Sequence, residues 1–101
     1  ETAAEGAARE TDEEAGAQIE LGPLIGLMNV VKVGQIHLFY GARLLSTAFN
    51  PGPETLEARL FHEHEVPWEQ IAFRTVREML QRHFEDRRLG RPPTLHTADI
   101  G

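Results

Sequence analysis

Residues 1–17, ETAAEGAARETDEEAGA, decide the fold that we expect for this 101-residue chain. Thr2 followed three residues later by Glu5 is a capping-box pattern, which marks the start of an α-helix. Gly16 provides the end of that helix, because glycine readily takes the left-handed conformation that follows a last helical turn. The sequence therefore predicts a helix over residues 2–15.

Three carboxylates gather on one side of this predicted helix. Glu10, Glu13 and Glu14 are related as i, i+3 and i+4, so they share one face and repel one another. A bound divalent cation would remove that repulsion, and hard cations such as Mg²⁺ favour oxygen ligands of this kind. Arg9 lies one turn before Glu13 and can bridge to it. On charge alone, two interpretations remain open: a metal site, or an acidic helix face exposed to solvent.

The spacing of these residues is more specific than their charge. It resembles the Nudix box, E-x7-R-E-U-x-E-E-x-G-U, in which U is an apolar residue. Thr11 and Ala17 are less apolar than the usual U residues, and the glycine that opens the box would precede Glu1. The positions that match the box are Glu1, Arg9, Glu10, Glu13, Glu14 and Gly16.

The resemblance implies an enzyme, a hydrolase that acts on phosphorus-containing acid anhydrides. In this family the glutamates that match Glu10, Glu13 and Glu14 bind Mg²⁺ or Mn²⁺, and the arginine that matches Arg9 orients Glu13. The glutamate that matches Glu1 supports the metal shell. A metal-activated water then attacks one phosphorus of a nucleoside diphosphate-linked compound, which is chemistry that divalent metals support.

Residues 50–90 extend the resemblance to a subgroup that includes ADP-ribose and FAD pyrophosphatases. The similar segments are Pro51-Gly52-Pro53-Glu54, Ile71-Ala72-Phe73 and the arginine-rich last helix. Many of these enzymes carry one more catalytic glutamate in a late loop, and Glu54 is our candidate. Its alternative interpretation is a surface turn residue. Glu57 is the second choice, although a structural salt bridge to Arg59 explains it equally well.

The remaining patterns predict a single mixed domain over residues 1–101. Strands are expected between about 18 and 62, at 18–21, 24–31, 34–45 and 57–62, with a hairpin connection at Lys32-Val33-Gly34. Thr75 and Glu78 repeat the capping-box pattern at the start of a helix over 75–88, and the tail 91–101 looks irregular. The fold class is therefore α/β, with a mixed α+β sheet. The resemblance implies a Nudix-like α/β/α sandwich that is N-terminally incomplete and starts at the catalytic helix.

Composition restricts the partners that we expect. The net charge is −6 and cysteine is absent, so we expect no nucleic-acid binding, no thiolate metal site and a cytoplasmic location. No apolar run is long enough to cross a membrane. The expected partners are a small-molecule nucleotide and a second copy of the chain, because an incomplete sheet exposes an edge.

His62 and His64 are expected to be surface residues, since a third zinc ligand at a familiar spacing is missing. The alternative to an enzyme is a non-catalytic Nudix-like binding module or an inactive fragment.

Overall fold

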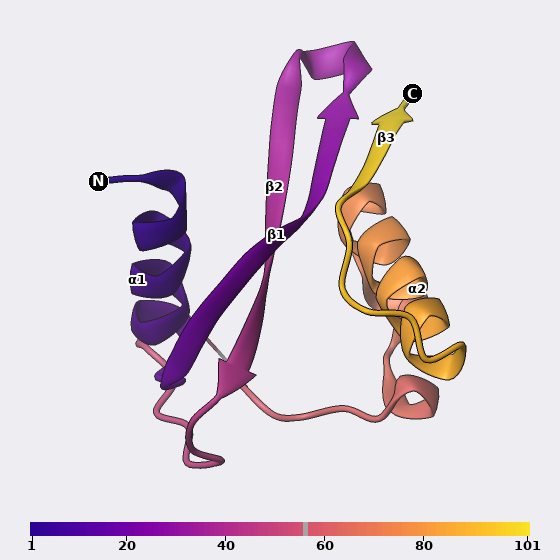
Figure 1. Cartoon of the computed structure of the whole chain (residues 1–101). Helices are drawn as coiled ribbons and strands as arrows, with labels where there is room; N and C mark the ends of the chain where they lie inside the picture. Colours follow the sequence, from indigo (N-terminus) through magenta and orange to yellow (C-terminus); the bar gives the residue numbers. More distant parts are fainter. Residues whose placement is uncertain (56) are drawn as a thin grey trace. The chain divides into compact units, whose positions relative to one another are not determined.

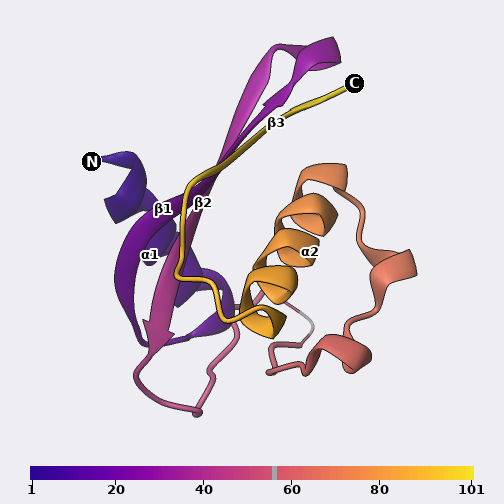
Figure 2. The ribbon, with the colours of Figure 1, turned by 45° about the vertical axis from the view of Figure 1, so that its right-hand side comes forward.

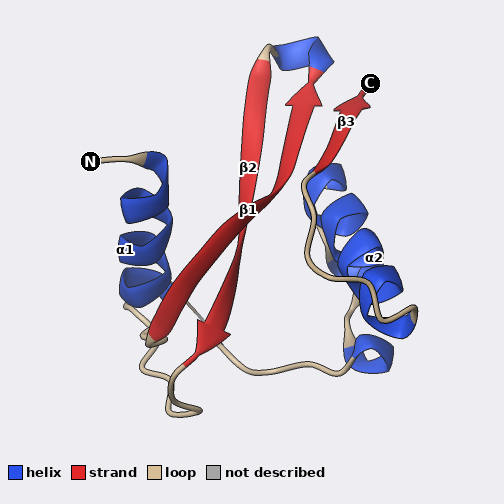
Figure 3. Cartoon of the chain, in the orientation of Figure 1, coloured by secondary structure: helices blue, strands red, loops and turns tan. Residues whose placement is uncertain are grey.

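The computed structural model of the protein describes residues 1–55 and 57–101. Two α-helices, three strands and three short 3₁₀ turns follow one another along these residues (Figures 1 and 3). In chain order they are α1 (Ala3–Ala15), β1 (Ile19–Val30), η1 (Val31–Val33), β2 (Gln35–Leu44), η2 (Glu63–Glu65), η3 (Trp68–Gln70), α2 (Arg74–Arg88) and β3 (His96–Ile100).

Helix α1 begins and ends as its sequence predicts. The amide of Glu5 donates to Thr2 Oγ1 at 3.0 Å, and the amide of Thr2 donates to the Glu5 carboxylate at 3.1 Å. These hydrogen bonds hold the pKa of Glu5 below its usual value, because they favour the ionised carboxylate. At the other end, Gly16 has φ of 60° and its amide donates to the carbonyl of Asp12. The predicted capping box and glycine stop are confirmed.

Strands β1 and β2 form one long antiparallel hairpin (Figure 1). We predicted a break in the first strand near Gly22-Pro23, but β1 runs through it without interruption. The 3₁₀ turn η1 and Gly34, with φ of 64°, connect the two strands, so the hairpin connection lies where it was expected. At the open end of the hairpin, the amide of Leu45 donates to the carbonyl of Gln18 at 2.9 Å.

The C-terminal segment contains a strand, so the prediction of an irregular tail over 91–101 was wrong. β3 pairs in parallel with β1 in a register that runs from Gly26↔His96 to Val30↔Ile100, which gives the sheet order β2-β1-β3 (Figure 1). Figure 2 shows β3 running along the hairpin to the C-terminus. The Asn29 side chain also donates to Asp99 at 2.9 Å. A parallel partner about 70 residues away leaves no local pattern in a five-residue strand. The sheet is therefore mixed, as the fold class predicted.

The strand predicted over residues 57–62 is absent from the described part of this segment. Leu60 and Phe61 are exposed, with 58% and 39% of their surface accessible. A strand is stabilised by hydrogen bonds to a neighbour and by burial of one face, and apolar composition guarantees neither.

Helix α2 begins one residue earlier than predicted and without the capping box of Thr75 and Glu78. Its N-cap is Phe73, whose side chain makes no capping hydrogen bond. Thr75 is 2% exposed, and its hydroxyl lies 2.7 Å from His37 Nδ1 on β2. Thr75, which resembles a helix cap in the sequence, therefore makes a buried polar contact between the helix and the sheet.

The contacts of the chain divide it into two compact units. Unit 1 consists of Glu1–Pro23 and Tyr40–Leu60, and so contains α1 and the open end of the hairpin. Unit 2 consists of Leu24–Phe39 and Phe61–Gly101, and contains the closed end of the hairpin, α2 and β3. None of the helices in the described residues has the length and apolar character needed to span a membrane.

The core of unit 2 lies between α2 and the sheet. Met28 on β1 is fully buried and Met79 on α2 is 4% exposed. A Cβ atom at Gly26 would lie 2.4 Å from the sulfur of Met79, so the absence of a side chain there lets the helix approach β1 closely.

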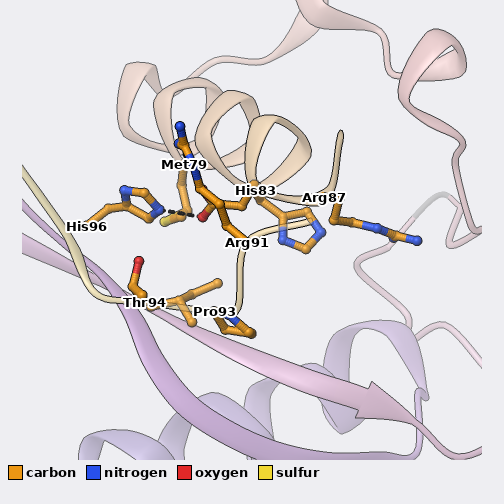
Figure 4. A pocket seen from close by; sticks show the side chains of 9 residues that line it. Met79, His83, Arg87, Arg91, Pro93, Thr94 and His96 are labelled. Atoms are coloured by element: carbon orange, nitrogen blue, oxygen red, sulfur yellow. Dashed lines mark hydrogen bonds and ion pairs between the residues drawn. The ribbon is translucent and has the colours of Figure 1, made fainter. Parts of the chain in front are cut away.

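A histidine–aspartate pair joins β3 to the last turn of α2. His96 Nε2 lies 2.7 Å from Asp86 Oδ2, and Arg91 lies 3.6 Å from the other oxygen of the same carboxylate (Figure 4). The pair borders a small cavity of about 60 Å³, which Met79 and Pro93 also line. The hydrogen bond from His96, with the charges of His96 and Arg91, holds the pKa of Asp86 below its usual value. The structure therefore favours the ionised form of this carboxylate.

We expect Asp86→Asn to lower stability at neutral pH and to flatten the loss of stability in acid. A carboxylate whose pKa is lowered by folding stabilises the protein above its unfolded pKa of roughly 4, and this contribution is lost as the pH falls through the lowered value. Urea unfolding midpoints at pH 7, 5 and 3 would show a gap between wild type and variant that narrows toward pH 3. A gap of constant size at all three pH values would contradict this account.

Candidate functional site

Arg9 joins two of the acidic side chains of the predicted site. Its Nε atom donates to both oxygens of Glu1, at 3.1 and 3.0 Å, and its Nη2 atom approaches Glu1 Oε1 at 2.6 Å. On the other side, Nη1 lies 3.2 and 3.0 Å from the two oxygens of Glu13. The bridge from Arg9 to Glu13 that the helix spacing predicts is present, and Glu1 occupies the rest of the guanidinium.

The three groups stabilise one another's charges. Hydrogen bonds from Arg9 hold the pKa of Glu1 below its usual value, and the carboxylates of Glu1 and Glu13 raise the pKa of Arg9. All three side chains are about half exposed. Exposed ion pairs contribute little to folding stability, so these contacts place the Glu13 carboxylate against the guanidinium of Arg9 without adding much to the stability of the fold.

Glu10 and Glu14 are less constrained than Glu13. A Glu10 oxygen lies 3.9 Å from Arg9, at the limit of an ion pair, and 62% of its side chain is exposed. The Glu14 side chain is exposed and makes no ion pair or hydrogen bond with the described residues. Exposed side chains change rotamer within nanoseconds, so both carboxylates can turn toward a ligand.

The donor chemistry of this face fits a hard divalent cation, although the side chains are not gathered around one point. Within residues 1–55 and 57–101, no three carboxylates or imidazoles are arranged so that they could hold a metal ion together. Oxygen ligands that are open to water are what Mg²⁺ selects, and a carboxylate that accepts from an arginine still has free lone pairs. The face therefore offers suitable ligands that would have to move inward to bind.

A loop that contains Glu54 is fixed to the C-terminal end of α1. The amide of Gly52 donates to the carbonyl of Glu14 at 3.0 Å, and the amide of Thr55 donates to the carbonyl of Gly52 at 3.0 Å. Glu54 itself is exposed. Glu57, the second candidate, forms an ion pair with Arg59 at 3.1 Å, as expected from its structural interpretation. The structure thus brings Glu54, on its loop, into the unit that contains the acidic helix.

Glycine is required on both sides of this contact. A Cβ atom at Gly52 would lie 2.3 Å from the carbonyl oxygen of Glu13, and one at Gly16 would lie 2.1 Å from that of Asn50. Both distances are far shorter than any van der Waals contact, so the two backbones approach as closely as they do only because neither residue has a side chain.

Two polar pairs in unit 2 were missed by the sequence analysis. His37–Thr75 and His96–Asp86 join residues 38 and 10 positions apart, and neither pair has a characteristic spacing. His62 and His64, by contrast, drew attention as a possible metal cluster. Their rings stack face to face with centroids 5.6 Å apart, and His62 is the N-cap of η2. Among the described residues they do not belong to a metal-holding group.

The chain matches no family model and no curated protein. Among solved structures, the crystal structure of a NUDIX hydrolase from Nitrosomonas europaea is similar, with 43% sequence identity and a TM-score of 0.91. The match covers 99% of this chain and 56% of that protein, so the chain spans just over half the length of its relative.

This likeness agrees with the pattern of residues 1–17. The described residues have the mixed α+β fold of the matching part of the relative, and the residues that suggest the box lie on α1 or within two residues of its ends. Sequence and structure together support the Nudix hydrolase family for this chain.

Proposed function

We propose that this chain is a Nudix pyrophosphohydrolase in which α1 is the catalytic helix. The observation that supports this most strongly is Arg9 held between Glu1 and Glu13 on α1, at box spacing, in a chain 43% identical to a Nudix hydrolase. The proposed reaction is hydrolysis of the diphosphate in a nucleoside diphosphate-linked compound.

Glu10, Glu13 and Glu14 would hold Mg²⁺ or Mn²⁺. Arg9 keeps Glu13 oriented, and Glu1 acts through Arg9, because its own oxygens already accept three contacts from the guanidinium. A divalent ion at this face would lower the pKa of a bound water and neutralise charge that develops on the phosphate oxygens. The acidic chain needs such an ion for a second reason: a phosphate substrate would otherwise be repelled by the carboxylates.

Glu54 would accept the proton of the attacking water or complete the set of oxygen ligands. Its position on a loop that is hydrogen-bonded to α1 supports this role, since a catalytic base must be held within hydrogen-bonding distance of the water it activates. The second candidate, Glu57, is less suitable because its carboxylate is paired with Arg59.

The proposed substrate class is ADP-ribose or FAD, and the products would be a nucleoside monophosphate and a phosphorylated remainder. The support is the resemblance of residues 50–90 to enzymes with these substrates. The relative is almost twice as long as this chain, so part of it has no counterpart here.

A non-catalytic binding module is the second candidate. One observation favours it: the carboxylates of the described residues are not assembled as a metal site. Calorimetric titration with Mg²⁺ and an assay of product release from ADP-ribose separate the two. An enzyme of this kind binds the ion and releases products, whereas a non-catalytic module does neither.

We also propose that two copies of the chain associate through the closed end of the hairpin. Four apolar side chains are exposed there, with 40% to 62% of their surface accessible: Val31, Val33, Ile36 and Leu38. Exposed apolar side chains that cluster in this way commonly mark an interface.

We expect Glu13→Gln to reduce turnover of ADP-ribose or FAD by at least about 100-fold, because the variant loses a charged ligand and the partner of Arg9. Release of AMP would be measured with Mg²⁺ and with Mn²⁺ across a panel of ADP-ribose, FAD and NADH. Asp12→Asn is the matched control, since it removes one exposed carboxylate from the same helix, and it should keep the wild-type rate. Equal rates for Glu13→Gln and wild type would refute the catalytic assignment.

We expect Ile36→Lys to shift the chain from dimer to monomer, because a charge in an apolar interface is costly to bury. Light scattering at several protein concentrations would give the masses. A wild-type chain that is monomeric at every concentration would rule out the proposed association.

A further inference from the structure

We propose that Gly52 is a positioning residue, which holds Glu54 beside the acidic face of α1 through a backbone contact. The proposal rests on the function proposed above, in which Glu54 assists and the glutamates of α1 hold the metal. It assigns to Gly52, outside the box, a role that the motif does not provide.

The contact provides a hydrogen-bond donor for a helix carbonyl that has no partner within the helix. The last carbonyls of an α-helix have no amide partner within the helix, and Glu14 is the penultimate residue of α1. The Gly52 amide supplies that partner at 3.0 Å. The loop is therefore bonded to the residue whose side chain is proposed to bind the metal.

A tight turn connects this contact to Glu54. The hydrogen bond from the Thr55 amide to the Gly52 carbonyl closes a four-residue turn in which Pro53 and Glu54 are the central residues. Proline fixes φ near the value that the first central position of such a turn requires. Only Pro53 lies between the bonded amide of Gly52 and Glu54, so the backbone of Glu54 has little freedom relative to Glu13 and Glu14.

The close approach of the backbones sets the position of the turn. Because Gly16 and Gly52 each face a backbone carbonyl at the short distances given above, a methyl group on either would push the loop away from the helix. A displacement of about 1 Å is enough to reduce a reaction about 100-fold when a catalytic group must be precisely placed.

The closeness of the contact can be tested with two glycines of matched conformation. Gly16 and Gly34 have φ of 60° and 64°, but nothing lies within 4 Å of a Cβ at Gly34. Alanine at either position incurs the same backbone strain, while only Gly16→Ala also meets the carbonyl of Asn50. We expect Gly34→Ala to lower Tm by roughly 5 °C and Gly16→Ala by at least about twice as much. Equal shifts would show that the loop is not tightly packed on α1.

Paramagnetic relaxation tests the positioning role without turnover. With Mn²⁺ bound to the ¹⁵N-labelled chain, the amide signals of Glu13, Glu14 and Glu54 should all broaden. In Gly52→Ala the relaxation enhancement at the Glu54 amide should fall relative to that of the α1 amides, because it depends on the inverse sixth power of the distance to the ion. Pro53→Gly, which loosens the turn without a clash, should cause a smaller fall and serves if Gly52→Ala does not fold. Gly34→Ala is the control and should match wild type.

A double-mutant cycle tests the same link through the reaction. Gly52→Ala should lower kcat for ADP-ribose about 10- to 100-fold with little change in KM. In a chain that already carries Glu54→Gln, the same substitution should have no further effect on kcat. Additive losses would overturn the positioning role, because they would mean that Gly52 does not act through Glu54.

The outcomes distinguish this proposal from the function on which it rests. If Mn²⁺ broadens no signal of α1, the metal site itself is wrong and both fail. If Mn²⁺ broadens α1 but leaves Glu54 sharp in wild type, the metal site stands and only the positioning role is overturned.

Discussion

The acidic face of α1 depends on the ion pairs that the guanidinium of Arg9 makes with its glutamates. Like charges at i, i+3 and i+4 destabilise a helix, and Arg9 places a positive charge among them. It contacts Glu1 before the helix, Glu13 one turn later and, more loosely, Glu10. It therefore offsets the repulsion and at the same time limits how the carboxylates of Glu1 and Glu13 can turn. A residue with one charge and several fixed donors suits this purpose better than lysine, which offers a single point of attachment.

Local patterns predicted local structure well. The capping box of Thr2 and Glu5, the glycine stop at Gly16 and the hairpin near Gly34 were all confirmed, because each depends on residues only a few positions apart. The same kind of pattern failed at Thr75. There a contact with His37, 38 residues away, buries the hydroxyl that would otherwise cap the helix. A short motif describes what the backbone can do, and the tertiary structure decides whether it does so.

The candidate site was predictable in part for the same reason. Box spacing identified the helix residues, and helix geometry alone predicted the contact of Arg9 with Glu13. The sequence could not show that Glu1 would occupy the other side of Arg9, nor that the loop of Glu54 would bond to α1 through Gly52. Both contacts depend on how segments meet in space.

The parallel pairing of β3 with β1 has a consequence for the order in which the chain acquires its structure. The hairpin of β1 and β2 joins residues close in sequence, so it can form while the chain emerges from the ribosome. The β1 edge opposite β2 must then wait for His96–Ile100, about 70 residues later. During synthesis, the amides and carbonyls of Gly26–Val30 on that edge remain open to other strands, and such edges favour aggregation. This interval is the time when the exposed edge is most open to pairing with a strand of another chain.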